Sequence, residues 1–375
     1  MVGTQKAWQL QCSMLSALRS GDTSLLRSLL DSGLDCDVTF RLSGCSRPAV
    51  CLAVERGHVG LVELLCARRC STSALDSGGL TPLHLAASLG YADIANTLIK
   101  NRAEINSSSS LGGDTPLHLA ASGNHHQVVQ LLLEQGAAVN LPNVDGKTSL
   151  MYAAAKGYQD IAQLLLSHGA NPNTLDNAGN SALLLHCSSA WVTAEMVVML
   201  SPSLAVINRS NTKGNYPILE IVKSYTDQKH RALVAIAKQG ADLNVTSTLG
   251  ATPLHIACSI KDWCSAQILV RAGAELDHED HLGHVPLLLT LTHNTFLLAG
   301  LMVAAGANCL FRADHNNRLS KEARAWVRSQ QKKTKSLKDI SRLVVRKMMA
   351  RRLDRCIEKA EMPNSLKQYV YFLLE

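Results

Sequence analysis

The stretch that decides the fold is Thr-Pro-Leu-His-Leu-Ala at residues 115–120. The same six residues occur at 81–86, and the stretch at 252–257 differs from them only by an isoleucine in place of the second leucine. The first two of these stretches begin 34 residues apart. Self-similarity at a fixed period of this length indicates a chain built from stacked copies of one small unit.

Each residue of this hexapeptide has a physical role at the start of a helix. The threonine hydroxyl can cap the free N–H groups of the first turn. Proline suits the first helical position, because its missing N–H would have no partner there. The leucine and alanine side chains face inward, and alanine lets a neighbouring helix approach closely. The period and the hexapeptide together resemble the ankyrin repeat, which implies one helix-turn-helix unit per copy.

About nine copies follow one another over residues 12–311, which we interpret as one continuous, curved ankyrin array. The first copy, 12–35, has no Thr-Pro pair, as expected of a terminal copy with one solvent-exposed face. The remaining copies begin at or near Pro48, Thr81, Thr115, Thr148, Ser181, Tyr216, Thr252 and Val285.

The sixth and seventh copies depart from the pattern. His186 stands at the position of the small alanine in the sixth copy, and Gly240, which closes the seventh, comes about three residues late. We therefore expect irregular helices or a change of curvature over these two copies. They are also where we would first look for a substrate-specific surface.

The composition agrees with an all-α ankyrin-repeat solenoid that carries a small C-terminal helical module. Aromatic residues make up only 4% of the chain, which suits stacked short helices better than a β-sandwich. There is no evident secretory signal, and no run of about 18 apolar residues suggests a membrane span. Eleven scattered cysteines without a disulfide spacing predict reduced thiols in the cytoplasm, with the nucleus as a second compartment.

The charge of the chain is uneven along its length. From Arg312 to the end there are 17 lysines and arginines against 7 aspartates and glutamates, whereas the formal net charge of the whole chain is +7. We interpret residues 312–335 as a basic, solvated linker, with a nuclear-localisation or phosphate-binding patch as the alternative. Few aromatic residues are present there to stack on bases, so nucleic acid is not an expected partner.

Residues 336–375 are predicted to form a separate helical module. Its first helix is expected at 336–353, where apolar residues recur at helical spacing: Leu337, Ile340, Val344 and Met348. A second short helix is expected at 365–374. Two helices of this size must lie against the last copy, each other or a partner protein.

This module resembles a SOCS box. In its first half Ser336, Leu337 and Val345 match the elongin C-binding element, and Ser341 stands at the position of its usual cysteine. Ankyrin repeats followed by such a box resemble the ankyrin-repeat and SOCS-box family over essentially the whole chain. In that family the box binds elongin B/C and a cullin-5 scaffold, and the ankyrin array recruits a protein substrate for ubiquitylation.

The second half of the module resembles the cullin-binding element of this family. Met362-Pro363 and Leu366 match the element, whereas Ala360 and Glu361 stand where a first Leu-Pro pair is usual. Carried over by position, the resemblance implies an elongin C-binding set of Leu337, Ile340, Ser341, Val344 and Val345, with Leu337 entering a pocket of elongin C. It implies a cullin-binding set of Met362, Pro363, Leu366 and Tyr369.

Two other interpretations of the C-terminal module remain. Its helices can serve only to cap the last copy of the array, since every solenoid needs such a cap. The chain can also be a non-enzymatic ankyrin scaffold without a role in ubiquitylation. In each case the partner of the ankyrin surface is an unidentified protein, with candidate contact tips at 107–113, 140–147 and 277–284.

The sequence predicts neither catalysis nor a cofactor. There is no glycine-rich phosphate loop and no nucleophile elbow. The histidines of the hexapeptide, His84, His118 and His255, are interpreted as structural hydrogen-bonding residues. No metal site is predicted either: Cys66 and Cys70 are interpreted as core cysteines, and the histidines on one polar tip as solvated residues, namely His278, His281 and His284.

Overall fold

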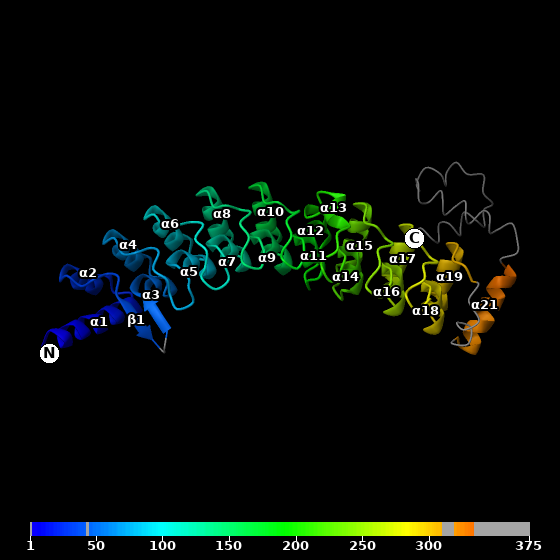
Figure 1. Ribbon diagram of the computed structural model, residues 1–375, viewed down its shortest axis with the longest axis horizontal. Coiled ribbons are helices and arrows are strands. Elements are labelled where there is room, and N and C mark those ends of the chain that lie inside the picture. The colour runs from blue at the N-terminus through cyan, green and yellow to red at the C-terminus, as the bar shows by residue number, and fades with distance from the viewer. Residues whose placement is uncertain (1, 43–44, 310–318, 334–375) are drawn as a thin grey trace. The chain divides into compact units, whose positions relative to one another are not determined.

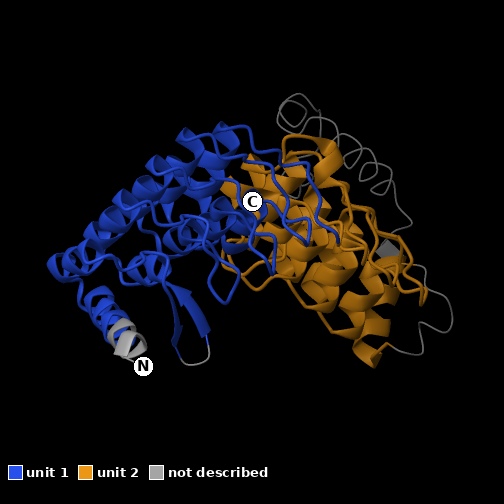
Figure 2. Ribbon diagram, turned by 60° about the vertical axis from the view of Figure 1, so that its left-hand side comes forward, with its two compact units in different colours: residues 1–177 blue, residues 178–375 orange. Residues whose placement is uncertain are grey.

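The computed structural model describes residues 2–42, 45–309 and 319–333, and these residues are mostly helical (Figure 1). They belong to two compact units, residues 1–177 and 178–375, which Figure 2 draws in blue and orange. Each unit is a stack of helix pairs, so the all-α ankyrin fold predicted from the hexapeptide is confirmed.

In the first unit, pairs of antiparallel helices follow one another in chain order. They are α1 (Val2–Ser20) with α2 (Thr23–Asp31), α3 (Ala49–Glu55) with α4 (Val59–Ala67), α5 (Pro82–Leu89) with α6 (Ala92–Lys100), α7 (Pro116–Ser122) with α8 (His126–Glu134), and α9 (Ser149–Lys156) with α10 (Gln159–Ser167). The first helix of each pair contacts the first helix of the next, and the second contacts the second.

The second unit repeats this arrangement with less regular members. Its helices are α11 (Ala182–Cys187), α12 (Ala194–Met199), α13 (Leu204–Ile207), α14 (Pro217–Lys223), α15 (Lys229–Lys238), α16 (Pro253–Ser259), α17 (Trp263–Arg271), α18 (Pro286–Thr292), α19 (Phe296–Ala304) and α21 (Lys321–Lys333). The helices α11, α14, α16 and α18 form one row, and α12, α15, α17 and α19 form the other.

The core lies between the two rows of helices in each unit. Leu117 and Ala120 of the hexapeptide are fully buried, as are Val128 and Leu132 of the partner helix α8. Burial of one leucine side chain contributes about 2 kcal/mol. Because every copy buries the same positions, the core continues from one helix pair to the next within a unit.

The irregular helices expected in the sixth and seventh copies are confirmed. Helices α11 and α12 have six residues each, and the short helix α13 follows them before the seventh copy begins. In the seventh copy α14 ends at Lys223 and α15 begins at Lys229, so the extra residues form the connection between the two helices.

Two elements at the beginning of the chain differ from the prediction. Helix α1 begins at Val2 rather than near residue 12, since no proline or glycine occurs between Gly3 and Gly21, where φ is +80°. A hairpin of β1 (Thr39–Leu42) and β2 (Cys45–Pro48) precedes α3, with Phe40 paired to Arg47 and its side chain buried. The hairpin adds residues that are absent from the regular copies, so the repeat pattern could not reveal it.

The segment predicted as a linker, 312–335, contains helix α21. Three apolar side chains on one stripe of this segment are buried, Leu319, Ala323 and Val327. The Trp326 ring lies against Phe296 of α19, with ring centroids 6.2 Å apart. Many charged residues lie between these apolar positions, so the net charge of the segment indicated a linker rather than a helix with an apolar stripe. Helix α21 therefore covers the end of the last described helix pair.

Candidate functional site

The predicted SOCS-box contacts lie outside the described residues. They are Leu337, Ile340, Ser341, Val344, Val345, Met362, Pro363, Leu366 and Tyr369. Their roles stay predictions. The described part of the candidate site is the surface of the ankyrin array. Among the described residues, no helix is both long and apolar enough to cross a membrane.

The hexapeptide histidines join each copy to the next. The Nδ1 atom of His118 accepts the Thr115 backbone N–H at 3.0 Å, and its Nε2 atom lies 3.0 Å from the Lys147 carbonyl oxygen of the following copy. His84 and His255 form the equivalent contacts with Asp114 and His284, at 2.8 and 3.0 Å. The imidazole is thus a bridge between neighbouring helix pairs.

This hydrogen-bond pattern assigns a neutral tautomer to these rings. Nδ1 of His118 accepts from a backbone N–H, so the proton lies on Nε2, which donates to the carbonyl oxygen. Burial lowers the pKa of His84, His118 and His255, because the charged form loses hydration. Each of these side chains is buried and neutral, and both of its ring nitrogens make hydrogen bonds. The histidines are therefore structural, as the sequence predicts.

A second ladder joins the copies on the other side of the helix pairs. The Asn140 side-chain oxygen accepts the Asn171 backbone N–H at 2.8 Å, one copy further on. The same bond recurs between Asn106 and Ala138, and between Asn244 and Glu275, also at 2.8 Å. These bonds hold the connections between copies in a fixed register.

The predicted contact tips are rigid turns that present apolar side chains. The Asn143 oxygen accepts the backbone N–H groups of Asp145 and Lys147, which closes the turn. In the first unit Leu111 and Val144 are 81% and 68% exposed on neighbouring tips, which a backbone bond from Val144 to Gly112 joins.

The second unit has a corresponding pair of tips. Leu249 and Leu282 are 73% and 75% exposed, and the His281 N–H donates to the Leu249 carbonyl oxygen at 3.1 Å. Exposed leucine or valine at the same position of successive copies is a surface that a protein partner can bury. The sequence placed the tips correctly but not their apolar residues, because exposure depends on the turn geometry.

The histidines on the tip at 277–284 do not converge on one point. His278 lies edge-on to His255, with ring centroids 6.1 Å apart, and His284 lies beside the Asp280 carboxylate at 3.4 Å. His278 and His284 are half-buried in this turn, and His281 is exposed.

An ion pair in the irregular region lies at the start of two second helices, α15 and α17. Lys229, at the start of α15, lies 2.6 Å from Asp262, which also caps helix α17 through the Ser265 N–H and hydroxyl. Burial raises the pKa of the Asp262 carboxyl, but the hydrogen bonds from Lys229 and Ser265 outweigh it and lower the pKa to about 2. This pair joins the seventh copy to the eighth.

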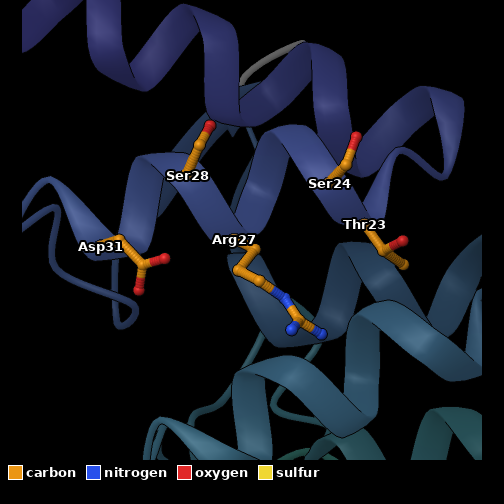
Figure 3. A pocket seen from close by; sticks show the side chains of 5 residues that line it. All are labelled: Thr23, Ser24, Arg27, Ser28 and Asp31. Carbon is orange, nitrogen blue, oxygen red and sulfur yellow. The ribbon is translucent and has the colours of Figure 1, made fainter.

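A polar hollow lies on the exposed side of helix α2. Figure 3 shows its lining side chains: Thr23, Ser24, Arg27, Ser28 and Asp31. Asp31 also pairs with Arg68 of α4, and Asp22 caps the helix through the Ser24 and Leu25 N–H groups. The hollow is open and formed by a single helix, so it has the features of a helix surface rather than of a ligand pocket.

Comparison with known families identifies both parts of the chain. Ankyrin-repeat models match residues 13–109 and 102–176 as three-copy arrays and residues 249–281 as a single repeat, and the SOCS box model matches residues 333–370. A stretch of 58 residues, 15% of this chain, is 45% identical to Ankyrin repeat domain-containing protein 35 of Homo sapiens, and the match spans 6% of that protein.

The two matched parts define the class of protein. Ankyrin repeats bind protein targets, and SOCS boxes generally bind elongin B/C. Both families are typically non-catalytic, and no enzymatic domain is matched. With ankyrin repeats followed by a SOCS box, the chain belongs to the ankyrin-repeat and SOCS-box family.

Proposed function

We propose that this chain is the substrate-recognition subunit of an elongin B/C–cullin-5 type E3 ubiquitin ligase. The observation that carries the proposal is the SOCS-box match at 333–370 directly after the ankyrin array. In this role the protein contributes no chemistry of its own. It holds a target near a ubiquitin-charged enzyme that other subunits recruit, in the cytoplasm or the nucleus.

The proposed elongin C contact centres on Leu337, with Ile340, Ser341, Val344 and Val345 around it. An apolar helix face that enters a groove is a common mode of protein recognition, and a few central apolar residues dominate its energy. We expect Leu337→Ala to weaken binding to elongin B/C by at least about tenfold, since a central residue contributes about 2 kcal/mol. Co-purification of the full chain with elongin B/C measures this.

The matched control is Arg342→Ala on the same predicted helix. It removes a polar side chain outside the apolar stripe, so binding to elongin B/C should stay within about twofold of the unchanged chain. Equal co-purification of the unchanged chain and the Leu337 variant would refute the proposed contact. So would failure of the unchanged chain to bind at all.

The choice of cullin depends on Met362, Pro363, Leu366 and Tyr369. If these residues bind cullin-5, Pro363→Ala should reduce the cullin-5 recovered with the chain from cells without reducing elongin C. Recovery of cullin-2 in place of cullin-5 would keep the adaptor role but overturn the proposed scaffold. Ala360 and Glu361, at the position of the usual Leu-Pro pair, make this a sharp test.

A scaffold without ubiquitin is the second candidate function. The departures at Ser341, Ala360 and Glu361 favour it, because each falls in an element that binds a ligase subunit. The two functions differ in the fate of the ankyrin partner. An adaptor predicts that the partner accumulates when the proteasome or cullin neddylation is inhibited, whereas a scaffold predicts an unchanged amount.

The proposed substrate surface lies in the second unit and combines its apolar tips with the irregular sixth and seventh copies. Trp191 and Tyr225 are 64% and 89% exposed in those copies, and large exposed aromatic side chains are frequent in protein interfaces. Affinity purification followed by mass spectrometry should lose the substrate in a Trp191→Ala, Tyr225→Ala variant and keep elongin C. The Leu337 variant should show the reverse.

A further inference from the structure

Three potential metal ligands meet at the junction of the first two copies. Cys36 and Asp37 follow helix α2, and Cys70 follows helix α4 in the next copy. The two sulfur atoms and a carboxylate oxygen all lie within 4.8 Å of one another. Cys70 is buried, Cys36 is half-buried and Asp37 is exposed, so the cluster reaches from the core to the surface.

The contacts inside this cluster already hold its members in place. The Cys70 thiol lies 3.0 Å from an Asp37 oxygen and 3.2 Å from the Cys36 carbonyl oxygen. The same Asp37 oxygen, Oδ1, accepts the Ser71 backbone N–H at 2.7 Å. The second carboxylate oxygen, Oδ2, is therefore the one that can bind a ligand while the bond to Ser71 is kept.

The other junctions show that the fold does not need the thiol of Cys70. The bond from Asp37 to Ser71 belongs to the ladder that asparagine makes elsewhere, as between Asn140 and Asn171. At the place of Cys70 six other copies carry alanine: Ala103, Ala137, Ala170, Ala241, Ala274 and Ala307. The thiol of Cys70, in contact with Cys36 and Asp37, thus exceeds what helix stacking requires.

We propose that Cys36, Asp37 and Cys70 form a binding site for a thiophilic divalent cation, with Zn²⁺ as the best fit. Zinc in proteins takes four ligands from cysteine, histidine and carboxylate side chains, and Zn–S bonds are about 2.3 Å long. Sulfur atoms around a tetrahedral ion then lie about 3.8 Å apart, so small side-chain rotations suffice to close the site. A water molecule completes the fourth position.

Binding exchanges protons for the metal ion. Two thiols become thiolates and release two protons, and with the Asp37 carboxylate they give the zinc group a net charge of −1. Burial raises the pKa of the Cys70 thiol well above its usual range, and the hydrogen bond to Asp37 raises it further. The cation must displace this proton, so affinity should rise steeply with pH.

The site would join the two copies at the beginning of the array. A cation held by Cys36 and Asp37 of the first copy and Cys70 of the second would bind the folded state alone. It would therefore stabilise this junction by mass action.

The test uses the full chain, reduced and freed of metal, with substitutions that copy other junctions. Cys70→Ala and Asp37→Asn install the residues that other copies carry, so the fold should be kept, and circular dichroism checks this. Cys36→Ser removes the third ligand. Cys12→Ser and Cys264→Ser, at two exposed thiols, are matched controls. Zn²⁺ affinity is measured by competition with a chromophoric chelator, and Co²⁺ reports thiolate ligation by its charge-transfer absorption.

The unchanged chain and the controls should bind Zn²⁺ at least about tenfold more tightly than Cys36→Ser and Cys70→Ala, and only these two variants should lose the cobalt–thiolate band. Asp37→Asn should weaken binding and keep the band. Zn²⁺ should raise the Tm of the unchanged chain and not that of Cys70→Ala. Equal Zn²⁺ binding by all variants would overturn the proposal. So would a reduced chain that binds no Zn²⁺ but forms a Cys36–Cys70 disulfide on oxidation.

Discussion

The fourth and sixth copies each bury a histidine in their first helix, but at different positions, and the two histidines make different hydrogen bonds. In the fourth copy His118 joins Thr115 to the Lys147 carbonyl oxygen of the next copy. In the sixth copy His186 stands two positions later in its helix, and its Nε2 atom accepts the Thr193 N–H of the same copy at 3.1 Å. His118 connects neighbouring copies, whereas the bond from Thr193 to His186 stabilises the turn inside one copy.

This difference shows how an array can become irregular without losing its core. The sixth copy gives up the hexapeptide, and Leu184 takes the place of the bridging histidine. From the seventh copy to the eighth, the ion pair of Lys229 and Asp262 is a link. Regular copies are joined by neutral hydrogen bonds, whereas the link from the seventh copy to the eighth adds an ion pair to the Asn244–Glu275 bond. Therefore pH and salt should act on the two regions differently.

The largest effect is expected from mild acid, because it acts on three bridging histidines at once. The folded-state pKa of His84, His118 and His255 lies below the ordinary value of 6.5, so the unfolded chain binds more protons as the pH falls through 6.5. Their stabilising contribution is complete above this pH and declines below it. Urea-unfolding midpoints measured from neutral pH downward should show the loss, and a midpoint independent of pH would contradict it.

The next largest effect should come from His118→Ala. The substitution leaves the Thr115 N–H and the Lys147 carbonyl oxygen buried without their partner and opens a cavity, at a cost of about 3 kcal/mol. His186→Ala should cost about half as much, because it frees one N–H within a single copy. His126→Ala, at an exposed position of α8, is the control and should leave the unfolding midpoint unchanged. Equal losses from His118→Ala and His186→Ala would break the comparison.

Asp262→Ala tests the charged link and should cost about 2 kcal/mol, since Lys229 is left with little exposure. The side chains of Asp262 and Lys229 are 11% and 12% exposed. The Asp262 pKa of about 2 lies below the ordinary value of 3.8, so its contribution persists above pH 3.8 and disappears as the pH falls toward 2. Thermal unfolding at low and high salt should show a smaller Asp262→Ala effect at high salt, whereas the effect of His118→Ala should not change.

The smallest effect distinguishes the threonine caps of the third and fifth copies. The Thr81 hydroxyl lies 2.8 Å from His84 Nδ1, whereas the fifth copy has Met151 at the histidine position. Among the described residues the buried Thr148 hydroxyl has no hydrogen-bond partner. Thr81→Val should therefore cost about 1 kcal/mol and Thr148→Val close to nothing. Denaturant titration of both variants decides, and a larger loss for Thr148→Val would contradict the explanation.

Local rules in the sequence predicted most of the helix pairs. Pro82, Pro116 and Pro253 are each the first residue of a helix, as the hexapeptide requires. Helix α21 was missed because its three apolar residues stand among many charges. Their burial becomes evident only when the helix packs against α19. The β1–β2 hairpin was missed because it occurs once and has no period.

The candidate site divides in the same way. The SOCS box was recognisable from spacing alone, and the family match at 333–370 agrees with it. The exposed side chains of Leu111, Val144, Leu249 and Leu282 could not be distinguished in sequence from core residues, since a hydrophobic residue in a turn can face either way. Their outward position follows from the closed turns that carry them.

The sequence by itself determined the ankyrin class, the start of the regular helices and the order of array and SOCS box, because each depends on residues close together in the chain. Only the tertiary structure decided which distant side chains meet. His118 and Lys147, Lys229 and Asp262, and Cys36 and Cys70 are each about one copy apart. Their contact depends on how one helix pair stacks on the next, which is a property of the packed core rather than of any single stretch.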